Sequence, residues 1–317
     1  MKITSIGEIL IDLTQTGCAE GGDPCFAAHP GGAPANAAVA ASRLGAESSF
    51  VGCVGNDSFG WQLKDTLEKC GIGTDGLQMT DKASTTIAVV TVDQNGERGF
   101  SFLRKPGADQ LIDRNLAAAT VKDAGILHFG SVSLTEEPCR STVIAAVTSA
   151  KKNGSLISYD PNYRASLWVS AEEAQKHIRE VLPLCDIVKM SDEETELMTG
   201  SSDPEKAAER LVEQGVSIVI ITLGSEGALW YHQGQCGIVP GFKSDVADTN
   251  GAGDTFWGAF LSCIAKHEGI EGLSPEDIER YVRFANMAAS LSVRKHGAIP
   301  SMPYLQEVEE ALRNEQG

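Results

Sequence analysis

The chain has 317 residues, of which 42% are hydrophobic and 22% charged, so it can form one large or two moderate globular domains and is not a disordered chain. Asp and Glu number 43 against 26 Lys and Arg, which gives a formal net charge of −17. Nucleic acids and anionic membranes attract basic surfaces, so neither is expected as a partner. Any anionic ligand must therefore be held by local features of the fold.

The eight cysteines show neither C-x₂-C spacing nor a zinc-ligand pattern. Several lie within apolar runs, such as Cys53 and Cys263, where free cysteine behaves as a small buried hydrophobe. The first apolar stretch is interrupted by Glu8 and Asp12 and is not expected to be a signal peptide. No apolar run approaches the length of about 20 residues that a membrane helix needs. These features predict a soluble cytoplasmic protein.

Short β-branched runs alternate with amphipathic stretches along most of the chain. The predicted strands are 3–7, 48–54, 125–130, 155–160, 186–190 and 217–224. The predicted helices are 33–44, 57–70, 137–152, 172–182 and 204–214, followed by 252–267, 275–294 and 303–314. This alternation predicts an α/β fold with a doubly wound, mostly parallel sheet flanked by helices.

Two segments, at about 9–29 and 75–104, interrupt this alternation with strand-like patterns. The Asn95-Gly96 pair between two such runs is a hairpin signal. We therefore expect a single domain over 1–317 with small lid strands inserted in these two segments. Exposed strand edges can pair with a second copy, so the lid strands could form a homodimer or could remain the flap of a monomer.

The segment ADTNGAGDTFWGAF (247–260) contains the strongest functional signal. Gly251, Ala252 and Gly253 precede a helical pattern, and a helix start offers unpaired N–H groups and a partial positive charge. Such a cradle, an anion hole, suits a phosphoryl group, and Asp254 beside it could take a proton from an attacking alcohol. The alternative is that Asp254 only caps the helix. A P-loop kinase is excluded because the sequence has no Gly-Lys dipeptide.

DTNGAGD, together with GGAPANAAVAASRLGAESSFVGCVG at 31–55, resembles the two signatures of the ribokinase/PfkB-type carbohydrate kinases. The resemblance extends from Ile3 to about Pro300 and implies a ribokinase-like fold. It also implies transfer of the γ-phosphoryl group of MgATP to a sugar hydroxyl. Asp254 would be the general base, and Gly251, Ala252 and Gly253 would form the anion hole.

The resemblance also implies an acceptor site formed by Asp12, Gly31, Gly32 and Asn36. A carboxylate such as that of Asp12 can accept hydrogen bonds from two vicinal hydroxyls. The segments FSFLRKPGAD (100–109) and YDPNYRASLW (159–168) are similar to the fructokinase-like branch and, more loosely, to 2-keto-3-deoxygluconate kinases. They add Arg104, Asn162 and Arg164. Fructose is the favoured acceptor, whereas a carboxylated sugar would explain two converging arginines.

For the nucleotide, SIVIITLGSEGALWY (217–231) is typical of a strand, a turn and a second strand. The resemblance places ATP against Thr222, Gly224 and Gly227, with Asn286 beside the purine and Lys189 near the phosphates. In the family's N-x-x-E region Ser191 replaces the usual Asn, and Glu194 would hold Mg²⁺ through water. Asp248 matches the family's ligand to a monovalent cation, so K⁺ is a further expected ligand.

Two other classes of protein fit the sequence less well than a kinase does. A non-catalytic sugar-sensing protein with the same fold would not need Asp254, Gly251, Gly253 and Glu194, all of which are present. A dinucleotide-dependent dehydrogenase would need G-x-G-x-x-G after the first strand, where this chain has GEILID.

Overall fold

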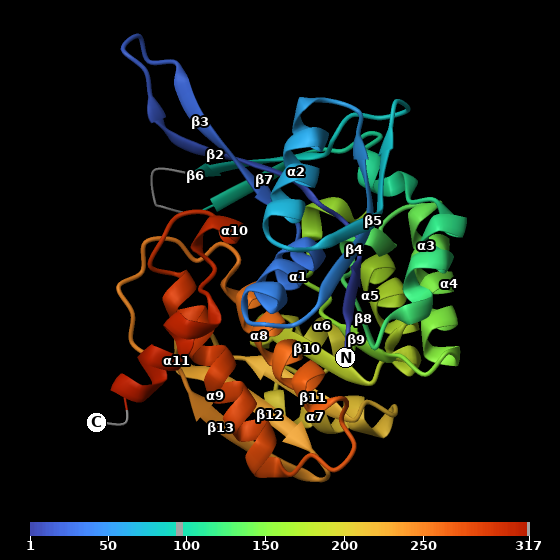
Figure 1. The fold of residues 1–317 in the computed structure, drawn as a ribbon, viewed down its shortest axis with the longest axis vertical. Helices are drawn as coiled ribbons and strands as arrows, with labels where there is room; N and C mark the ends of the chain where they lie inside the picture. The colour runs from blue at the N-terminus through green and yellow to red at the C-terminus, as the bar shows by residue number, and fades with distance from the viewer. Residues whose placement is uncertain (93–97, 316–317) are drawn as a thin grey trace.

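The computed structural model describes residues 1–92 and 98–315. Within them, one nine-stranded sheet crosses the molecule (Figure 1). In spatial order its strands are β13 (Gln235–Pro240), β12 (Gly227–His232), β11 (Ile218–Thr222), β10 (Ile187–Ser191), β9 (Leu156–Tyr159), β8 (Ile126–Phe129), β1 (Ile3–Ile6), β4 (Ser48–Gly55) and β5 (Gly73–Thr80). The pairs from β11 to β5 are parallel, and β12 and β13 add an antiparallel edge. The predicted doubly wound, mostly parallel sheet is confirmed.

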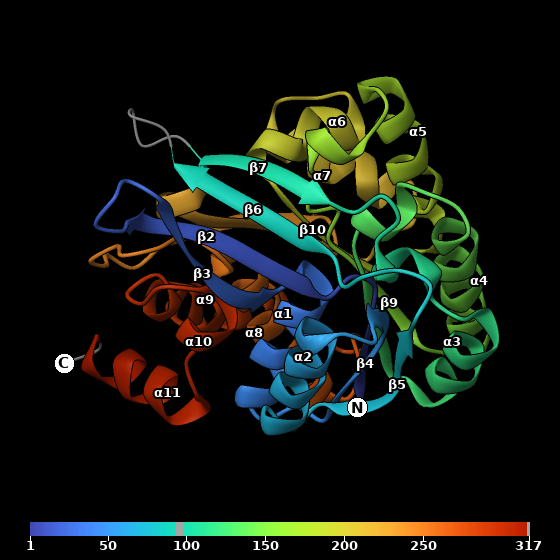
Figure 2. The same cartoon turned by 90° about the horizontal axis from the view of Figure 1, so that it is seen from above.

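Helices cover both faces of this sheet (Figures 1 and 2). On one face α3, α4, α5 and α7 pack on the strands, and on the other face α1, α8, α9 and α11 do so. The helix bounds are α1 (Ala33–Arg43), α2 (Ser58–Lys69), α3 (Arg114–Thr120), α4 (Cys139–Lys152), α5 (Ala171–Glu180), α6 (Thr195–Thr199), α7 (Pro204–Glu213), α8 (Ala252–His267), α9 (Pro275–Ser292), α10 (Ala298–Ser301) and α11 (Leu305–Asn314). The predicted strands and helices are confirmed, with ends that differ by a few residues.

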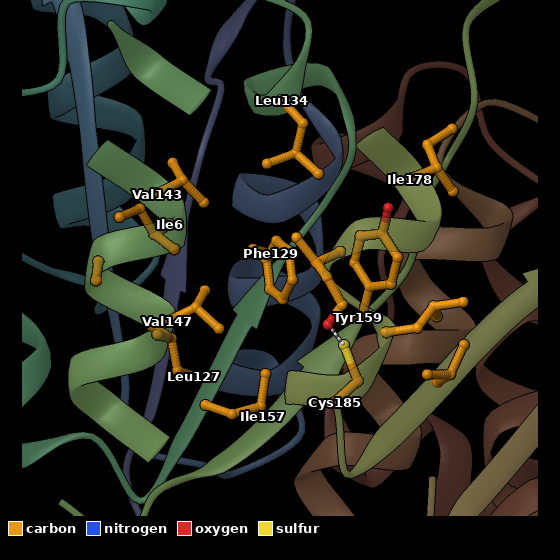
Figure 3. Packing of buried hydrophobic residues seen from close by; sticks show 14 of the residues in the cluster. Ile6, Leu127, Phe129, Leu134, Val143, Val147, Ile157, Tyr159, Ile178 and Cys185 are labelled. Carbon is orange, nitrogen blue, oxygen red and sulfur yellow. Dashed lines mark hydrogen bonds between the residues drawn. The ribbon is translucent and has the colours of Figure 1, made fainter. Parts of the chain in front are cut away.

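The core on the α4 face shows why the central strands are mostly apolar. Figure 3 shows Phe129 of β8 beside Tyr159 of β9, and their ring centroids are 4.6 Å apart. Val143 and Val147 of α4 pack in the same cluster. Parallel strands are buried on both faces, so each one needs apolar residues at successive positions. Few polar side chains lie inside these strands, among them His128 of β8, Ser158 of β9 and Lys189 of β10.

A second, four-stranded sheet lies over one end of the large sheet (Figure 2). Its strands, in spatial order, are β3 (Pro24–Gly31), β2 (Leu10–Cys18), β6 (Ile87–Val92) and β7 (Arg98–Leu103). We call it the lid sheet. It comprises the predicted insertion at 9–29, but the boundary of the second insertion at 75 was wrong. Residues 75–80 belong to β5, which pairs in parallel with β4 because α2 returns the chain to the large sheet.

β6 and β7 pair antiparallel, with Val92 opposite Arg98. The Asn95-Gly96 pair that predicted their hairpin turn lies outside the described residues. Among the described helices, none combines the length and the apolar character needed to cross a lipid bilayer.

Candidate active site

The residues predicted to form the anion hole lie where α8 begins. Gly251 is the residue before the helix and has a φ of 76°, a left-handed conformation that favours glycine. A Cβ on Gly251 would collide with Ala298, so the close approach of these two loops also requires glycine. The main-chain N–H groups of Ala252 and Gly253 lie in the first turn, where an α-helix has no internal acceptors for them. The Ala252 N–H makes a long hydrogen bond to the Thr249 carbonyl at 3.3 Å. This end of α8 can therefore bind an anion without a basic surface.

Asp254 lies in the same first turn, with 8% of its surface exposed. Its Oδ2 accepts a hydrogen bond from Asn36 Nδ2 at 2.8 Å, and its Oδ1 accepts one from Asn162 Nδ2 at 3.1 Å. Burial raises the pKa of Asp254 above its ordinary value, and the two amide hydrogen bonds oppose that shift. The carboxylate is thus held in one orientation and made more basic, as acceptance of a hydroxyl proton requires.

The two asparagines that hold Asp254 come from opposite sides of the site. Asn36 is in the first turns of α1, and its Oδ1 is buried without a hydrogen-bond partner among the described residues. Asn162 follows β9 with a φ of 44°, and its N–H donates to Asp160 Oδ1 at 3.2 Å. Asn tolerates this left-handed conformation better than most residues. Asn36 therefore has an acceptor available for a ligand hydroxyl.

Asp12 of β2 lies close to Asn250, which precedes α8. Asn250 Nδ2 lies 3.4 Å from Asp12 Oδ2, close to the limit for a hydrogen bond. Gly31 is opposite this part of β2 on β3, and a Cβ at Gly31 would overlap the Asp12 carboxylate. Burial raises the pKa of Asp12 to about 6, with the Asn250 contact opposing the shift and the nearby Asp254 adding to it. Gly31 therefore shapes the site by making room for Asp12.

One cavity under the lid sheet brings most of the predicted acceptor residues together. Of the predicted residues, its lining includes Asp12, Gly32, Asn36, Asn162, Arg164 and Asp254. The other lining residues are Glu8, Leu10, Ala33, Ala88, Phe102, Val132 and Asn250. Sequence reasoning missed the role of Glu8 and Asn250 in this lining. The available signal for Glu8 was an acid placed between apolar residues directly after the first strand.

Arg104 is not among the described residues that line this cavity. It is 5% exposed, and its guanidinium forms an ion pair with Asp109 at 2.7 Å. Further donors go to Thr135 Oγ1 at 2.7 Å and to the Val132 carbonyl at 3.1 Å. The guanidinium is therefore largely occupied by the protein, and it anchors the end of β7 to the body of the domain.

Lys189 of β10 lies beneath the anion hole. Its Nζ forms a buried ion pair with Asp160 Oδ2 at 2.7 Å, and it is 3.2 Å from where a Cβ of Gly253 would be. Burial alone favours the neutral amine, but Asp160 and Glu194 hold the pKa of Lys189 above its ordinary value. The ammonium charge therefore lies close to the position that the anion hole offers to a phosphoryl group.

Glu194 is in the 3₁₀ turn that follows β10. Its Oε1 accepts from the Tyr163 N–H at 2.6 Å, and its Oε2 accepts from the Ser191 N–H at 2.8 Å and Ser191 Oγ at 3.2 Å. A carboxylate has about four lone-pair sites, so one remains for a water molecule. Ser191, in the position where the family usually has Asn, thus contributes to the orientation of Glu194.

The predicted nucleotide residues lie outside the cavity, at the neighbouring strand ends. Thr222 ends β11 next to Ser191, and Gly224 and Gly227 form the turn into β12. Asn286 of α9 is buried, and its Nδ2 donates to the carbonyls of Val239 and Pro240 at 3.0 and 3.2 Å. The amide donors of Asn286 therefore join α9 to β13, and only its carbonyl oxygen is left for a ligand.

Asp248 connects two loops at the start of α8. Its Oδ1 accepts from the Asn250 N–H at 2.9 Å, and its Oδ2 accepts from the Gly297 N–H at 3.0 Å. The side chain thus brings together the two loops whose carbonyls would complete a cation site. Across residues 1–92 and 98–315, no three His, Cys, Asp or Glu side chains gather as a group that could hold a metal ion.

Comparisons with known proteins agree with this geometry. The model of the pfkB family of carbohydrate kinases matches residues 1–305. The chain is 41% identical to fructokinase-1 of Zea mays over 310 residues, which are 96% of each protein. The structure of a Xylella fastidiosa fructokinase with bound ATP superposes with a TM-score of 0.89 at 32% identity, covering 100% of this chain and 99% of that one.

A double mutant of the Vibrio cholerae O395 fructokinase, with fructose, ADP and potassium ion bound, superposes with a TM-score of 0.87. It is 30% identical and covers 98% of this chain and 97% of its own. The fold and these relatives identify a sugar-phosphorylating enzyme of the α/β class. The chain belongs to the pfkB family of carbohydrate kinases.

Proposed function

We propose that this protein is an ATP-dependent fructokinase that transfers the γ-phosphoryl group of MgATP to a hydroxyl of fructose. The observation that carries the proposal is the position of Asp254. Its carboxylate lines the acceptor cavity and shares the first turn of α8 with the main-chain N–H groups of the anion hole. Fructose and ATP are the ligands named for the similar solved structures, which supports this choice of substrates.

In the proposed reaction, Asp254 accepts the proton of the attacking hydroxyl, and the hydroxyl oxygen forms a bond to the γ-phosphorus as the bond to ADP breaks. Asn36 and Asn162 hold the carboxylate, so no reorientation is needed during the transfer. The N–H groups of Ala252 and Gly253, with the Lys189 ammonium nearby, stabilise the negative charge on the transferred group.

Two ions are part of the proposal. Mg²⁺ binds few protein groups directly and keeps several waters, which fits the one lone-pair site that Glu194 retains. When bound to the triphosphate, Mg²⁺ neutralises charge that develops during transfer. Asp248, with carbonyls of the loops that it joins, would hold a monovalent cation, and K⁺ is the one named in the Vibrio cholerae structure.

The acceptor is proposed to be a neutral sugar because of the two arginines. Arg164 lines the cavity, whereas the guanidinium of Arg104 is occupied by Asp109 and Thr135. A carboxylated sugar such as 2-keto-3-deoxygluconate gains most where two guanidinium groups converge on its carboxylate. A single arginine that hydrogen-bonds hydroxyls suits fructose better.

The test is ATP consumption with fructose, 2-keto-3-deoxygluconate, ribose and nucleosides, for the wild type and Asp254→Asn. We expect fructose to have the highest kcat/KM. Loss of the base should reduce kcat roughly 10²–10⁴-fold, with the dissociation constant for ATP unchanged. The matched control is Asp245→Asn, an exposed acid a few residues earlier, which should behave as the wild type.

Three outcomes would contradict the proposal. No turnover of any acceptor would support the sugar-sensing alternative, and preference for 2-keto-3-deoxygluconate would overturn the choice of fructose. Unimpaired turnover by Asp254→Asn would remove that residue from its assigned role.

We further infer that the protein works in the cytoplasm and forms a homodimer through the lid sheet. All eight cysteines are free, which suits a reducing compartment. β3 and β7 are the outer strands of the lid sheet, and outer strands can pair with a second copy. Sedimentation equilibrium should give the mass of two chains, and the mass of one chain at all concentrations would contradict the dimer.

A further inference from the structure

The acceptor cavity contains a buried acid that the reaction described above does not use. Glu8 follows β1 after one residue and has 3% of its surface exposed. Its Oε1 accepts a hydrogen bond from the N–H of Ala33, the first residue of α1, at 3.2 Å. Its Oε2 is buried and has no hydrogen-bond partner among the residues that the structure describes. A buried oxygen without a hydrogen-bond partner lowers stability, and a ligand in the cavity can supply the missing hydrogen bond.

The surroundings of Glu8 favour its neutral form. Burial is the main reason that the pKa of Glu8 rises to about 8, so the side chain is mostly protonated at neutral pH. Hydrogen bonding to its own main-chain N–H, the charge of Arg104 and the hydrogen bond from Ala33 oppose this rise in pKa, whereas the charge of Asp109 adds to it. The other titratable or charged groups near Glu8 are Cys139 of α4 and, in the cavity lining, Asp12, Asp254 and Arg164.

The hydrogen bond from Ala33 determines which oxygen carries the proton. Because Oε1 accepts from an N–H group, the proton of the neutral acid belongs on Oε2, the oxygen without a partner. The cavity already presents acceptors to a sugar, namely the carboxylate of Asp12 and the Oδ1 of Asn36. Each sugar hydroxyl both donates and accepts, so the cavity also needs donors.

We propose that Glu8 is a further sugar-binding residue, which positions the acceptor by donating a hydrogen bond from its protonated Oε2 to a hydroxyl oxygen. This inference rests on the proposed function, because it concerns the same sugar. It assigns Glu8 to substrate positioning and leaves proton acceptance to Asp254.

The test compares Glu8→Gln, Glu8→Ala and the wild type. Glutamine keeps one oxygen to accept from Ala33 and places an NH₂ donor where Oε2 was, so it should retain the sugar KM at neutral pH. Alanine removes the donor, and the sugar KM should rise roughly three- to tenfold, as expected for one neutral hydrogen bond. The KM for ATP should not change in either variant. Glu47→Gln, an exposed glutamate ahead of β4, is the matched control.

The pH dependence separates a hydrogen-bond donor from a merely structural residue. One pH unit above a pKa of about 8, the wild type should bind fructose roughly tenfold more weakly than at neutral pH. Glu8→Gln should lack this loss, and the difference between the two proteins removes the contribution of other titrating groups. Isothermal titration calorimetry with fructose and no nucleotide measures the affinity without catalysis.

The proposal is overturned if Glu8→Ala leaves sugar affinity unchanged or weakens sugar and ATP equally. It is also overturned if the wild type and Glu8→Gln share one pH profile. If the wild type binds a sugar of the panel but phosphorylates none, the kinase proposal fails, and the binding data still decide the role of Glu8. If no sugar of the panel binds, both proposals fail.

Discussion

Substitution of Arg164 should affect sugar binding and leave ATP binding unchanged. Arg164 follows the Asn162 turn after β9 and lines the acceptor cavity, away from the strand ends at Thr222 and Gly224. A hydrogen bond from a charged donor contributes about 1.5–3 kcal/mol. We expect Arg164→Ala to raise the KM for fructose by roughly tenfold or more and to leave the KM for ATP unchanged.

Steady-state kinetics with each substrate varied in turn measures this split. Arg114→Ala, an exposed arginine at the start of α3, serves as the control. Equal increases in both KM values would place Arg164 in the nucleotide site instead.

The protonation state of Asp12 provides a second prediction for a single residue. Burial raises its pKa to about 6, so Asp12 is ionised above that pH and neutral below it. The ionised form can accept two hydroxyl hydrogen bonds, and protonation converts one of its oxygens into a donor. We therefore expect the KM for fructose to rise as pH falls from about 7 to 5.

The same titration on Asp12→Asn provides the comparison. Its KM should be higher at neutral pH and should not show the acid-side rise. A wild-type KM that stays constant through pH 6 would contradict the assigned role of Asp12.

Sequence patterns predicted some of the residues in the cavity but not the surroundings of others. Asp12, Asn36, Asn162 and Asp254 lie on four separate segments, and motif resemblance was enough to predict that they meet. Arg104 was predicted to bind the sugar, but its guanidinium forms a buried ion pair with Asp109. An ion pair of this kind can be recognised only in the folded chain. Glu8 was missed because its burial and unpaired Oε2 exist only after β1, α1 and the lid sheet are assembled.

Among the elements, the lid sheet depends on a small polar cluster at its base. Thr86 precedes β6 and Arg104 follows β7, and both donate to the carboxylate of Asp109. The Asp109 side chain therefore clamps the two ends of the β6–β7 pair to the 3₁₀ turn at Ala108–Leu111. The position of the lid over the cavity is set by this contact as well as by strand pairing.

We expect Asp109→Ala to lower the free energy of unfolding by about 3–5 kcal/mol, because Arg104 would remain buried without its partner. Urea unfolding followed by circular dichroism measures this loss. Asp123→Asn, an exposed acid after α3, should leave the stability unchanged. If Asp109→Ala were as stable as the control, the cluster would not anchor the lid.

For the whole molecule, the buried acids of the site link stability to pH. Burial raises the pKa values of Glu8, Asp12 and Asp254, so the native state binds more protons than the unfolded chain at intermediate pH. Stability conferred by such acids is fully present below their unfolded pKa values, near 4, and is lost as pH rises through the native values. The contribution of Glu8 is therefore lost by about pH 8.

Glu8→Gln removes an acid whose pKa is raised further by burial than that of Asp12. We expect the free energy of unfolding of this variant, minus that of the wild type, to increase by roughly 3–5 kcal/mol as the pH is raised from about 5 to about 9. Each unit of pKa corresponds to about 1.4 kcal/mol. Denaturant unfolding at the two pH values, with Glu47→Gln as control, measures the gain. A stability difference that does not change with pH would show that Glu8 is not buried as a neutral acid.

Sequence patterns were enough to predict the α/β alternation, the doubly wound sheet and the helix start at Gly251, because these follow from local periodicity and from glycines with local conformational needs. Resemblance to a known family predicted many of the residues that line the cavity. The pairing of β5 with β4, the ion pair of Arg104 with Asp109 and the position of Glu8 in the cavity could be seen only in the folded chain. These depend on contacts between segments distant in sequence, where burial and charge pairing are properties of the assembled fold.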